Sequence, residues 1–539
     1  MYFSPGSETE DKPILADFGN CFTLGLVNPP GGQELMTIMA EFEAPGGAAD
    51  HNNRANALYA AGRLDEAAEA MRRALELDPS LLDTRLNLAI VLHRLVGNRA
   101  GQALFGDQRQ DVGEVRRHYE SLPFPPRDPE AERYAIKVST PDTLAKVNQY
   151  CFGGSRDFSR PFRALVAGCG TGDGVIWLAH QLRDTPAEIV AVDMTEASLA
   201  VARERARIRG LENIRWVHGS LLDVASFGVG MFDYITCLGV LHHLPDPPAG
   251  LRALDSVLAE GGAMAVMLYG AVGRSHIYAT QRLLRQMTAG LDHPADQLAF
   301  AKRVVGAFPP SNEFRRREGI ELVRSAYLAN DTNFWDTLMH ARDRAYTASE
   351  VRGFMASAGL RVQSFVSYNG ISATTSLQYD VAFLIGAPSH LAALSLAERE
   401  DAAEMLDGSL ALHTVYATRA SNSALDPASP GAILSPASDL ARNILTHLSQ
   451  PNAEITIRLR NGFSFLYRPS EAMRAFLGRI DGRRRNAEIA AGPDIDLRIP
   501  AALHWVTART GEGTAFPPLP DRTRLSFPLT HSEPGYLPV

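Results

Sequence analysis

The stretch Ala164-Leu165-Val166-Ala167-Gly168-Cys169-Gly170-Thr171-Gly172 joins an apolar run to a loop in which every second residue is glycine. A helical pattern follows over residues 174–182. Glycine lets a backbone turn tightly and approach a ligand without a Cβ in the way. The start of a helix offers N–H groups and positive dipole character to an anionic group. The order of strand, glycine loop and helix therefore predicts a ligand site of the nucleotide-binding kind in an α/β domain.

Apolar runs and amphipathic segments alternate after this loop, which predicts βαβ units and a parallel sheet. Thr347-Ala348-Ser349-Glu350 is a capping box that opens a helix to Ala358. We expect residues 271–345 to form a mostly helical insertion between the fifth and sixth strands. The expected strands are 164–167, 188–192, 214–217, 234–237, 263–268, 360–366 and 380–385, and the first helices are 174–182, 195–209 and 247–258.

The composition of the 539-residue chain is that of a soluble globular protein with two to four domains. The net charge is −8 and no long basic block occurs, which argues against a dedicated nucleic-acid binder. No apolar run reaches about 18 residues and no signal-peptide pattern opens the chain, so we expect a cytoplasmic protein without a membrane partner. No CxxC pair occurs, so neither a zinc site nor a disulfide framework is indicated among Cys21, Cys151, Cys169 and Cys237.

The N-terminal region is predicted to contain an arm and a short helical module. Residues 1–50 are rich in Gly, Pro and acidic residues and are expected to be mobile. Residues 51–110 resemble one tetratricopeptide unit, with Gly62 in the turn and Pro79 after the second helix, followed by the start of another unit. About three such units are needed to bury a continuous core. The module is therefore a packed fragment, a self-association contact or, less expectedly, a surface for a protein partner.

Residues 111–160 are expected to form a strap or lid. Three prolines in the stretch Leu122-Pro123-Phe124-Pro125-Pro126 favour an extended segment that crosses a domain face. Tyr119 or Phe124 would then either cover a ligand or anchor a linker.

The C-terminal part is predicted to be a small α+β unit at residues 439–539, after a helical segment and linker at 389–438. Apolar residues alternate on both sides of Asn461-Gly462, which suits a type I′ turn and predicts a hairpin over 455–468. A helix over 470–480 follows.

The glycine spacing separates two kinds of nucleotide site. In the nicotinamide-dinucleotide pattern GxGxxG, the third glycine would fall on Asp173 or Val175, so neither register fits. Asp193 ends the second strand, where a carboxylate is placed to accept the ribose hydroxyls of an adenosyl group. Asp223 follows the third strand and is placed to accept the adenine amino group, while Leu222 packs on the ring.

Residues 163–268 resemble the S-adenosylmethionine (SAM)-binding core of class I methyltransferases, and Cys237–Asp246 is similar to the motif that follows the fourth strand in that family. Residues 115–388 resemble a bacterial subgroup with a tetratricopeptide-like N-terminus. The resemblance implies a Rossmann-like, seven-stranded methyltransferase domain over residues 161–388, with SAM above the carboxyl edge of the sheet. The implied cofactor-binding residues are Gly168, Cys169, Gly170, Thr171, Gly172, Asp193, Met194, Leu222, Asp223 and Gly239.

One position departs from the family pattern. Many members carry an acid two residues before the first glycine, where it helps to hold the methionine amino group, but Val166 stands there. Asp173 or backbone carbonyls of the loop would take over this role.

The implied reaction is methyl transfer from SAM to an N or O nucleophile of an unidentified acceptor, with S-adenosylhomocysteine (SAH) as product and no metal required. The alternatives are a SAM-binding regulatory or interaction module without turnover, and a protein methyltransferase that grips a polypeptide. A base is needed only if the acceptor loses a proton. The catalytic candidates are His242, His243 and His340. Further candidates for the base are His276 and Asp343. Substrate contacts are expected from Tyr119, Tyr269, Arg274, Tyr278, Asp343 and Tyr346.

Overall fold

The computed structural model consists of two compact units, residues 1–107 and residues 108–539. The N-terminal arm, as far as residue 46, lies outside the described residues. The described residues are 47–60, 63–78, 119–133, 136–340, 342–366, 376–385, 393–419, 422–437, 439–458, 464–489 and 506–513, with 81, 84, 88, 116, 391, 497 and 500.

The first unit contains the helices α2 (Ala48–Ala60) and α3 (Leu64–Leu77), so the helical pattern begins three residues before the expected position 51. Small and apolar side chains, including Ala55, Leu58 and Met71, are buried where the two helices meet. Leu88 packs against this cluster. The predicted turn at Gly62 and the predicted stop at Pro79 lie outside the described residues.

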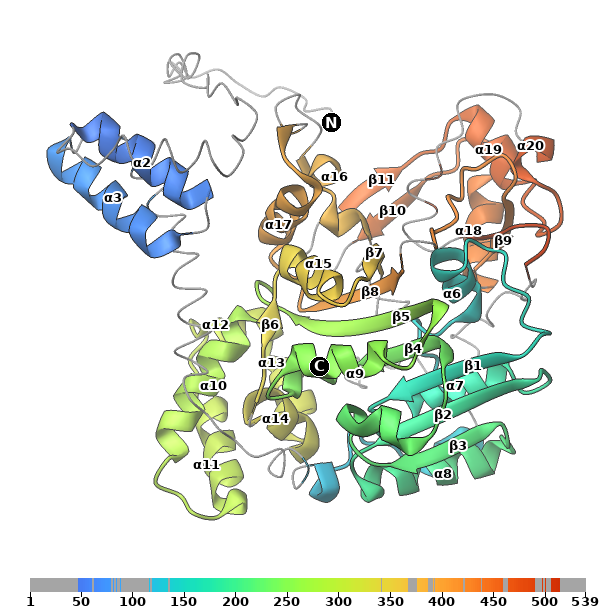
Figure 1. Cartoon of the computed structure of the whole chain (residues 1–539), viewed down its shortest axis with the longest axis horizontal. Coiled ribbons are helices and arrows are strands. Elements are labelled where there is room, and N and C mark those ends of the chain that lie inside the picture. Colours follow the sequence, from blue (N-terminus) through green and yellow to red (C-terminus); the bar gives the residue numbers. More distant parts are fainter. Residues whose placement is uncertain are drawn as a thin grey trace, which may run out of the picture. The chain divides into compact units, whose positions relative to one another are not determined.

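The second unit is built on a sheet of eight strands, one more than the predicted seven, in the order β3-β2-β1-β4-β5-β8-β7 with β6 paired to β5 (Figure 1). Strands β1 to β6 run parallel, and β8 runs antiparallel to both of its neighbours. The strands are β1 (Phe162–Ala167), β2 (Ala187–Asp193), β3 (Ile214–His218), β4 (Phe232–Leu238), β5 (Leu258–Gly270), β6 (Ala345–Tyr346), β7 (Arg361–Val366) and β8 (Leu412–Thr418).

The predicted strand at residues 380–385 is wrong. These residues follow the short helix η5 (Ser376–Tyr379) and form α16 (Val381–Ile385), which the carboxylate of Asp380 caps by accepting from the Ala382 N–H at 2.9 Å. A short apolar run suits a buried helix as well as a strand. The closing strand is β8, whose residues are all buried. The sheet therefore runs to Thr418, beyond the expected end of the domain at 388.

Helices cover both faces of the sheet, and the central parallel strands β1, β2 and β4 are accordingly apolar on both sides. Alternate residues of β1 show this, because Val166 packs with α7 and α8 while Leu165 packs with α9 and α15. The helices are α6 (Leu144–Cys151), α7 (Asp173–Gln181) and α8 (Glu196–Arg209) on one side, with α9 (Pro247–Asp255) and α15 (Ala348–Ala356) on the other. The predicted capping box of α15 is confirmed at Thr347 and Glu350.

The predicted helical insertion after β5 is confirmed as a bundle with its own buried cluster that includes Ile277, Phe314 and Phe334. The short strand β6, which follows the bundle, was not predicted. Figure 1 shows these helices gathered beside β6. Because the bundle begins where β5 ends, it lies at the carboxyl edge of the sheet. It consists of α10 (Ser275–Thr288), α11 (Pro294–Gly306), α12 (Glu313–Glu318), α13 (Ile320–Leu322), η4 (Val323–Leu328) and α14 (Asp331–Leu338).

Two segments hold more regular structure than the sequence predicts. The expected strap contains η1 (Pro129–Arg133) and the buried helix α6. The expected linker contains β9 (Ile433–Pro436), which pairs with β12 (Val506–Arg509) because its apolar residues close a separate C-terminal core.

The C-terminal hairpin of β10 (Ile455–Arg458) and β11 (Ser464–Tyr467) is confirmed, although its turn lies outside the described residues. The predicted helix after it is α19 (Glu471–Leu477). The remaining helices are α17 (Leu396–Asp407), α18 (Asp439–Leu448) and α20 (Asn486–Ile489). Within the part of the chain that the structure describes, no helix has the length and apolar character to cross a membrane.

Candidate functional site

The glycine loop lies at the point where the strand order reverses. Strand β1 has β2 on one side and β4 on the other, and ligands of open α/β sheets bind at such a switch point. The backbone N–H groups of Gly168 and Cys169 both donate to the Val192 carbonyl, at 2.8 and 3.0 Å, which ties the loop to β2. Gly168 has a φ of +71°, and a Cβ there would lie 2.4 Å from Val240. The loops after β1 and β4 are thus in contact.

Asp193 holds the glycine loop from the end of β2. Its Oδ2 accepts from the Gly170 N–H at 2.8 Å, while Oδ1 accepts from the Thr195 N–H at 3.0 Å and the Thr195 hydroxyl at 2.8 Å. Burial raises the pKa of Asp193, and these hydrogen bonds oppose the rise. Since Oδ1 already accepts twice, Oδ2 is the oxygen with room for a ligand hydroxyl.

The other expected cofactor residues lie in the loops after β2, β3 and β4. The Met194 carbonyl lies 3.2 Å from Nε2 of His218. Leu222 and Asp223 are exposed in the short helix η2 (Leu221–Phe227). Gly239 has a φ of +79° and leads into η3 (Leu241–His243). The carboxyl edge therefore carries the whole predicted set, whereas the Cys169 and Thr171 side chains are buried and turned from solvent.

The strap, here residues 119–133, lies directly on the glycine loop. The Phe124 carbonyl accepts from the Thr171 N–H at 3.2 Å, and the Pro125 carbonyl accepts from the Thr171 hydroxyl at 2.6 Å. A Cβ on Gly170 would lie 2.5 Å from the Phe124 carbonyl oxygen. The N–H and the hydroxyl of Thr171 are therefore paired with the strap and are not available to a ligand.

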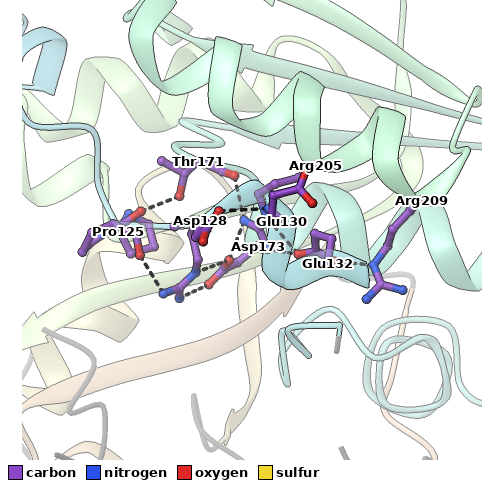
Figure 2. A network of polar contacts seen from close by, with 10 residues as sticks. Pro125, Asp128, Glu130, Glu132, Thr171, Asp173, Arg205 and Arg209 are labelled. Carbon is purple, nitrogen blue, oxygen red and sulfur yellow. Dashed lines mark hydrogen bonds and ion pairs between the residues drawn. The ribbon is translucent and has the colours of Figure 1, made fainter. Parts of the chain in front are cut away.

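A chain of charged residues fastens the strap to α7 and α8, as Figure 2 shows. Arg127 donates to both oxygens of Asp173, at 2.9 and 2.6 Å, and Arg205 donates to Asp173 at 2.8 Å. Arg205 also donates twice to Glu132, at 2.9 and 2.7 Å, and Arg209 pairs with the other oxygen of Glu132. Burial opposes ionisation of Asp173, but the hydrogen bonds and charge of Arg127, with the charge of Arg205, hold its pKa well below the usual range.

Replacing Gly170 by alanine is expected to displace the strap, because the added Cβ meets a backbone oxygen that cannot rotate away. Gly210→Ala is the matched control, since Gly210 also has positive φ (+63°) but nothing within 4 Å of its Cβ position. We expect Gly170→Ala to cost about 1–3 kcal/mol more than Gly210→Ala in urea unfolding. Equal losses in the two variants would contradict the close contact with the strap.

A second group of side chains, the histidine cluster, gathers at the ends of β4 and β5. The rings of His242 and Tyr269 lie 3.8 Å apart and those of His243 and His340 lie 3.9 Å apart, between centroids. The Arg274 guanidinium stacks 3.6 Å from the centre of the Tyr269 ring. The cluster comprises Tyr119, His242, His243, Tyr269, Arg274, Tyr278, Asp336, His340 and Asp343.

The hydrogen bonds of the cluster place the ring protons. Nδ1 of His243 lies 2.7 Å from the Arg342 carbonyl, so this nitrogen carries a proton and Nε2 is the basic nitrogen in the neutral ring. Nδ1 of His340 accepts from the Arg342 N–H at 3.0 Å, so the proton of its neutral ring is on Nε2. Neither nitrogen of His242 has a hydrogen-bond partner of ordinary geometry.

Burial makes the two neighbouring histidines poor bases. It lowers the pKa of His242 well below the usual value, and the nearby His243, Arg274 and His340 add to this effect. Burial also lowers the pKa of His243, although Asp343 opposes the shift. Both rings are therefore neutral at pH 7.

Arg274 and Asp343 form a buried pair inside the cluster, each about 1% exposed. Arg274 donates to Asp343 at 3.2 Å, Gln281 donates to the same oxygen at 3.1 Å, and the Tyr278 hydroxyl donates to the other oxygen at 3.3 Å. The positive charge of Arg274 therefore balances the negative charge of Asp343, and both oxygens of Asp343 accept hydrogen bonds.

Two expected site residues lie elsewhere. The Tyr346 ring packs against Phe354 in the core of the sheet, so it does not join the other expected substrate residues. His276 pairs with Glu318 at 2.7 Å within the helical bundle. Conversely, the sequence analysis missed Asp336, Arg127 and Arg205, because their partners lie far away in the chain.

The comparisons with known proteins agree with this geometry. Residues 165–264 match the methyltransferase domain family, and residues 48–81 match the tetratricopeptide repeat. The chain carries a methyltransferase domain. This match confirms the resemblance carried by the glycine loop and the strand-end residues.

Two curated relatives of this chain come from bacteria. An uncharacterized protein of Synechococcus sp. is 36% identical over 254 residues, which are 46% of this chain and 58% of that protein. A ubiquinone biosynthesis O-methyltransferase of Acinetobacter baumannii is 28% identical over 131 residues, which are 24% of this chain and 54% of that protein. The chain thus matches a little over half the length of these relatives.

Among solved structures, PKMT2 from Rickettsia typhi in complex with AdoHcy aligns with a TM-score of 0.49 and 13% identity, over 72% of this chain and 78% of that chain.

Proposed function

We propose that this chain transfers a methyl group from SAM to an N or O nucleophile of an acceptor bound at the histidine cluster. The observation that supports this most is the position of the glycine loop at the switch point, with Asp193 bonded to Gly170 and the histidine cluster beginning three residues after Gly239. The family match over residues 165–264 agrees with it.

The residues at the switch point fit an adenosyl cofactor. The loop keeps this shape because Gly168 and Gly170 have positive φ and no Cβ, which would meet Val240 or the Phe124 carbonyl. Oδ2 of Asp193 is the acceptor for a ribose hydroxyl, and Asp223 with Leu222 stands at the adenine end. Asp173 is committed to Arg127 and Arg205, so loop carbonyls remain as the alternative for the methionine amino group.

SAM supplies the electrophilic methyl group and the thioether leaving group. The chain's own residues then have two tasks, which are alignment of the nucleophile and exclusion of water. Alignment of this kind supplies roughly 7–11 kcal/mol in favourable cases. Tyr269, His242 and His243 are nearly or fully buried, and the proposal places the acceptor against them. The strap covers the loop at Thr171.

The match at residues 48–81 covers one tetratricopeptide repeat, and stacked repeats of this kind form interaction surfaces, which raises the hypothesis of a protein partner for the N-terminal unit. This supports two related hypotheses. The acceptor is a polypeptide, or the domain binds SAM and regulates an assembly without turnover.

Label transfer separates these hypotheses. The full chain is incubated with [methyl-³H]SAM and with separate small-molecule and protein fractions of a bacterial extract. We expect SAH to form in equal amount with labelled product in one fraction. If SAM binds but neither fraction yields SAH, the catalytic proposal is wrong and the binding module stands.

A further inference from the structure

Polar atoms without a hydrogen-bond partner are concentrated around the histidine cluster. Thirteen buried side-chain nitrogen or oxygen atoms in the described residues lack a partner, and six of them lie here. A buried polar atom left unpaired is unfavourable and calls for an explanation, such as a ligand that pairs with it. The six atoms are Oδ2 of Asp336, both ring nitrogens of His242, Nε of Arg274, Oε1 of Gln281 and Oγ1 of Thr337.

Asp336 is the carboxylate in this set, and its two oxygens differ. Oδ1 accepts from the Tyr119 hydroxyl at 2.8 Å, and that hydroxyl lies 3.2 Å from Nε2 of His340. Since the His340 proton is on Nε2, the protons run from His340 to Tyr119 to Oδ1 of Asp336. Oδ2 accepts no hydrogen bond, although the Asp336 side chain is buried and only 1% exposed. Asp343, by contrast, is held by Arg274, Gln281 and Tyr278 through both of its oxygens.

We propose that Asp336 is the catalytic base, whose Oδ2 takes the proton from the N–H or O–H group of the methyl acceptor. This rests on the proposed function. As the bond from the acceptor's N or O to the methyl carbon forms, the C–S bond breaks and its electron pair stays on sulfur, giving neutral SAH. The acceptor's proton moves to Oδ2, so that atoms and charge balance.

The surroundings suit Asp336 to this task. Burial raises its pKa to about 7, while the hydrogen bond from Tyr119 and the charge of Arg274 lower it and the charge of Asp343 raises it. His340 faces Asp336 through Tyr119, and Tyr269 packs on Arg274. A base with a pKa near the working pH transfers protons most effectively. Its ionised form is needed, so activity falls as the pH falls through about 7.

The test uses Asp336→Asn, which keeps the shape and the Tyr119 hydrogen bond, and Tyr119→Phe, which removes that bond. With [methyl-³H]SAM and the extract fraction that supports wild-type transfer, we expect Asp336→Asn to lose about 10²–10⁴-fold in label transfer. Tyr119→Phe removes a hydrogen bond that lowers the pKa of Asp336, so the acidic limb of its pH profile moves to higher pH. A purely structural role for Tyr119 would not move that limb.

Three further measurements make the outcome decisive. Calorimetry with SAM checks that Asp336→Asn keeps wild-type affinity, and Asp331→Asn, an exposed change on the same helix, should transfer label like the wild type. His243→Gln tests the rival base. If the limb persists in Asp336→Asn and disappears in His243→Gln, or if Asp336→Asn transfers label within threefold of the wild type, the assignment is wrong. If the wild type binds SAM but transfers no methyl group, the proposed function is wrong, and so is the assignment of Asp336 as the base.

Discussion

Replacing Arg205 by methionine is expected to lower the free energy of unfolding by about 3 kcal/mol. The Arg205 side chain is 1% exposed and donates to Glu132, Asp173 and the Thr171 carbonyl. Removing one partner from a buried ion pair costs about 3–5 kcal/mol, because the other charge is left uncompensated. Arg209 still neutralises Glu132, which places the expected loss at the low end.

Arg203→Met provides the matched control for this measurement. Arg203 lies on the same helix, is 38% exposed and pairs with Glu196 at the surface, where such pairs contribute about 0–1 kcal/mol. Urea unfolding followed by tryptophan fluorescence gives both values. Similar midpoints for Arg205→Met and Arg203→Met would show that the strap network does not stabilise the domain.

Asp193→Ala is expected to weaken SAM binding by at least about 100-fold, equivalent to roughly 2.7 kcal/mol. The substitution removes the acceptor proposed for a ribose hydroxyl. It also removes the oxygen that accepts from the Gly170 N–H at 2.8 Å, so the loop loses an anchor at the same time. Circular dichroism should show an intact fold, because the strand itself is held by its neighbours β1 and β3.

Glu196→Gln serves as the control for Asp193→Ala, since Glu196 is half exposed and lies three residues further on. Isothermal titration with SAM measures both variants. Unchanged affinity in Asp193→Ala would overturn the placement of the cofactor.

Strands β1, β2, β4 and β5 were predictable because they are mostly buried and bounded by helices. The strand β3 is only partly buried, and the two-residue strand β6 was not predicted. The end of the sheet was not predictable either. Residues 380–385 are as apolar as a strand, and only the pairing of β8 with β5 and β7 decides which segment closes the sheet. The periodicity of a short apolar run does not show whether the run forms a strand or a buried helix, because strand pairing depends on distant segments.

The site divides in the same way. The loops after β1 to β4 follow from strand ends, which are local features. The strap network could not be predicted in this way. Arg205 is one of several arginines in a helix, and its partner Glu132 lies 73 residues away. Asp336 likewise meets Tyr119 across 217 residues. Tyr346 was expected at the acceptor end from its place in sequence, but its ring turns into the core.

The most direct test of the central claim is calorimetric titration of the full chain with SAM and, separately, with NAD⁺. The glycine spacing at 168, 170 and 172 and the position of Asp193 predict saturable one-to-one binding of SAM, loss of that binding in Asp193→Ala, and no binding of NAD⁺. Binding of NAD⁺, or no binding of SAM by the wild type, would contradict the account.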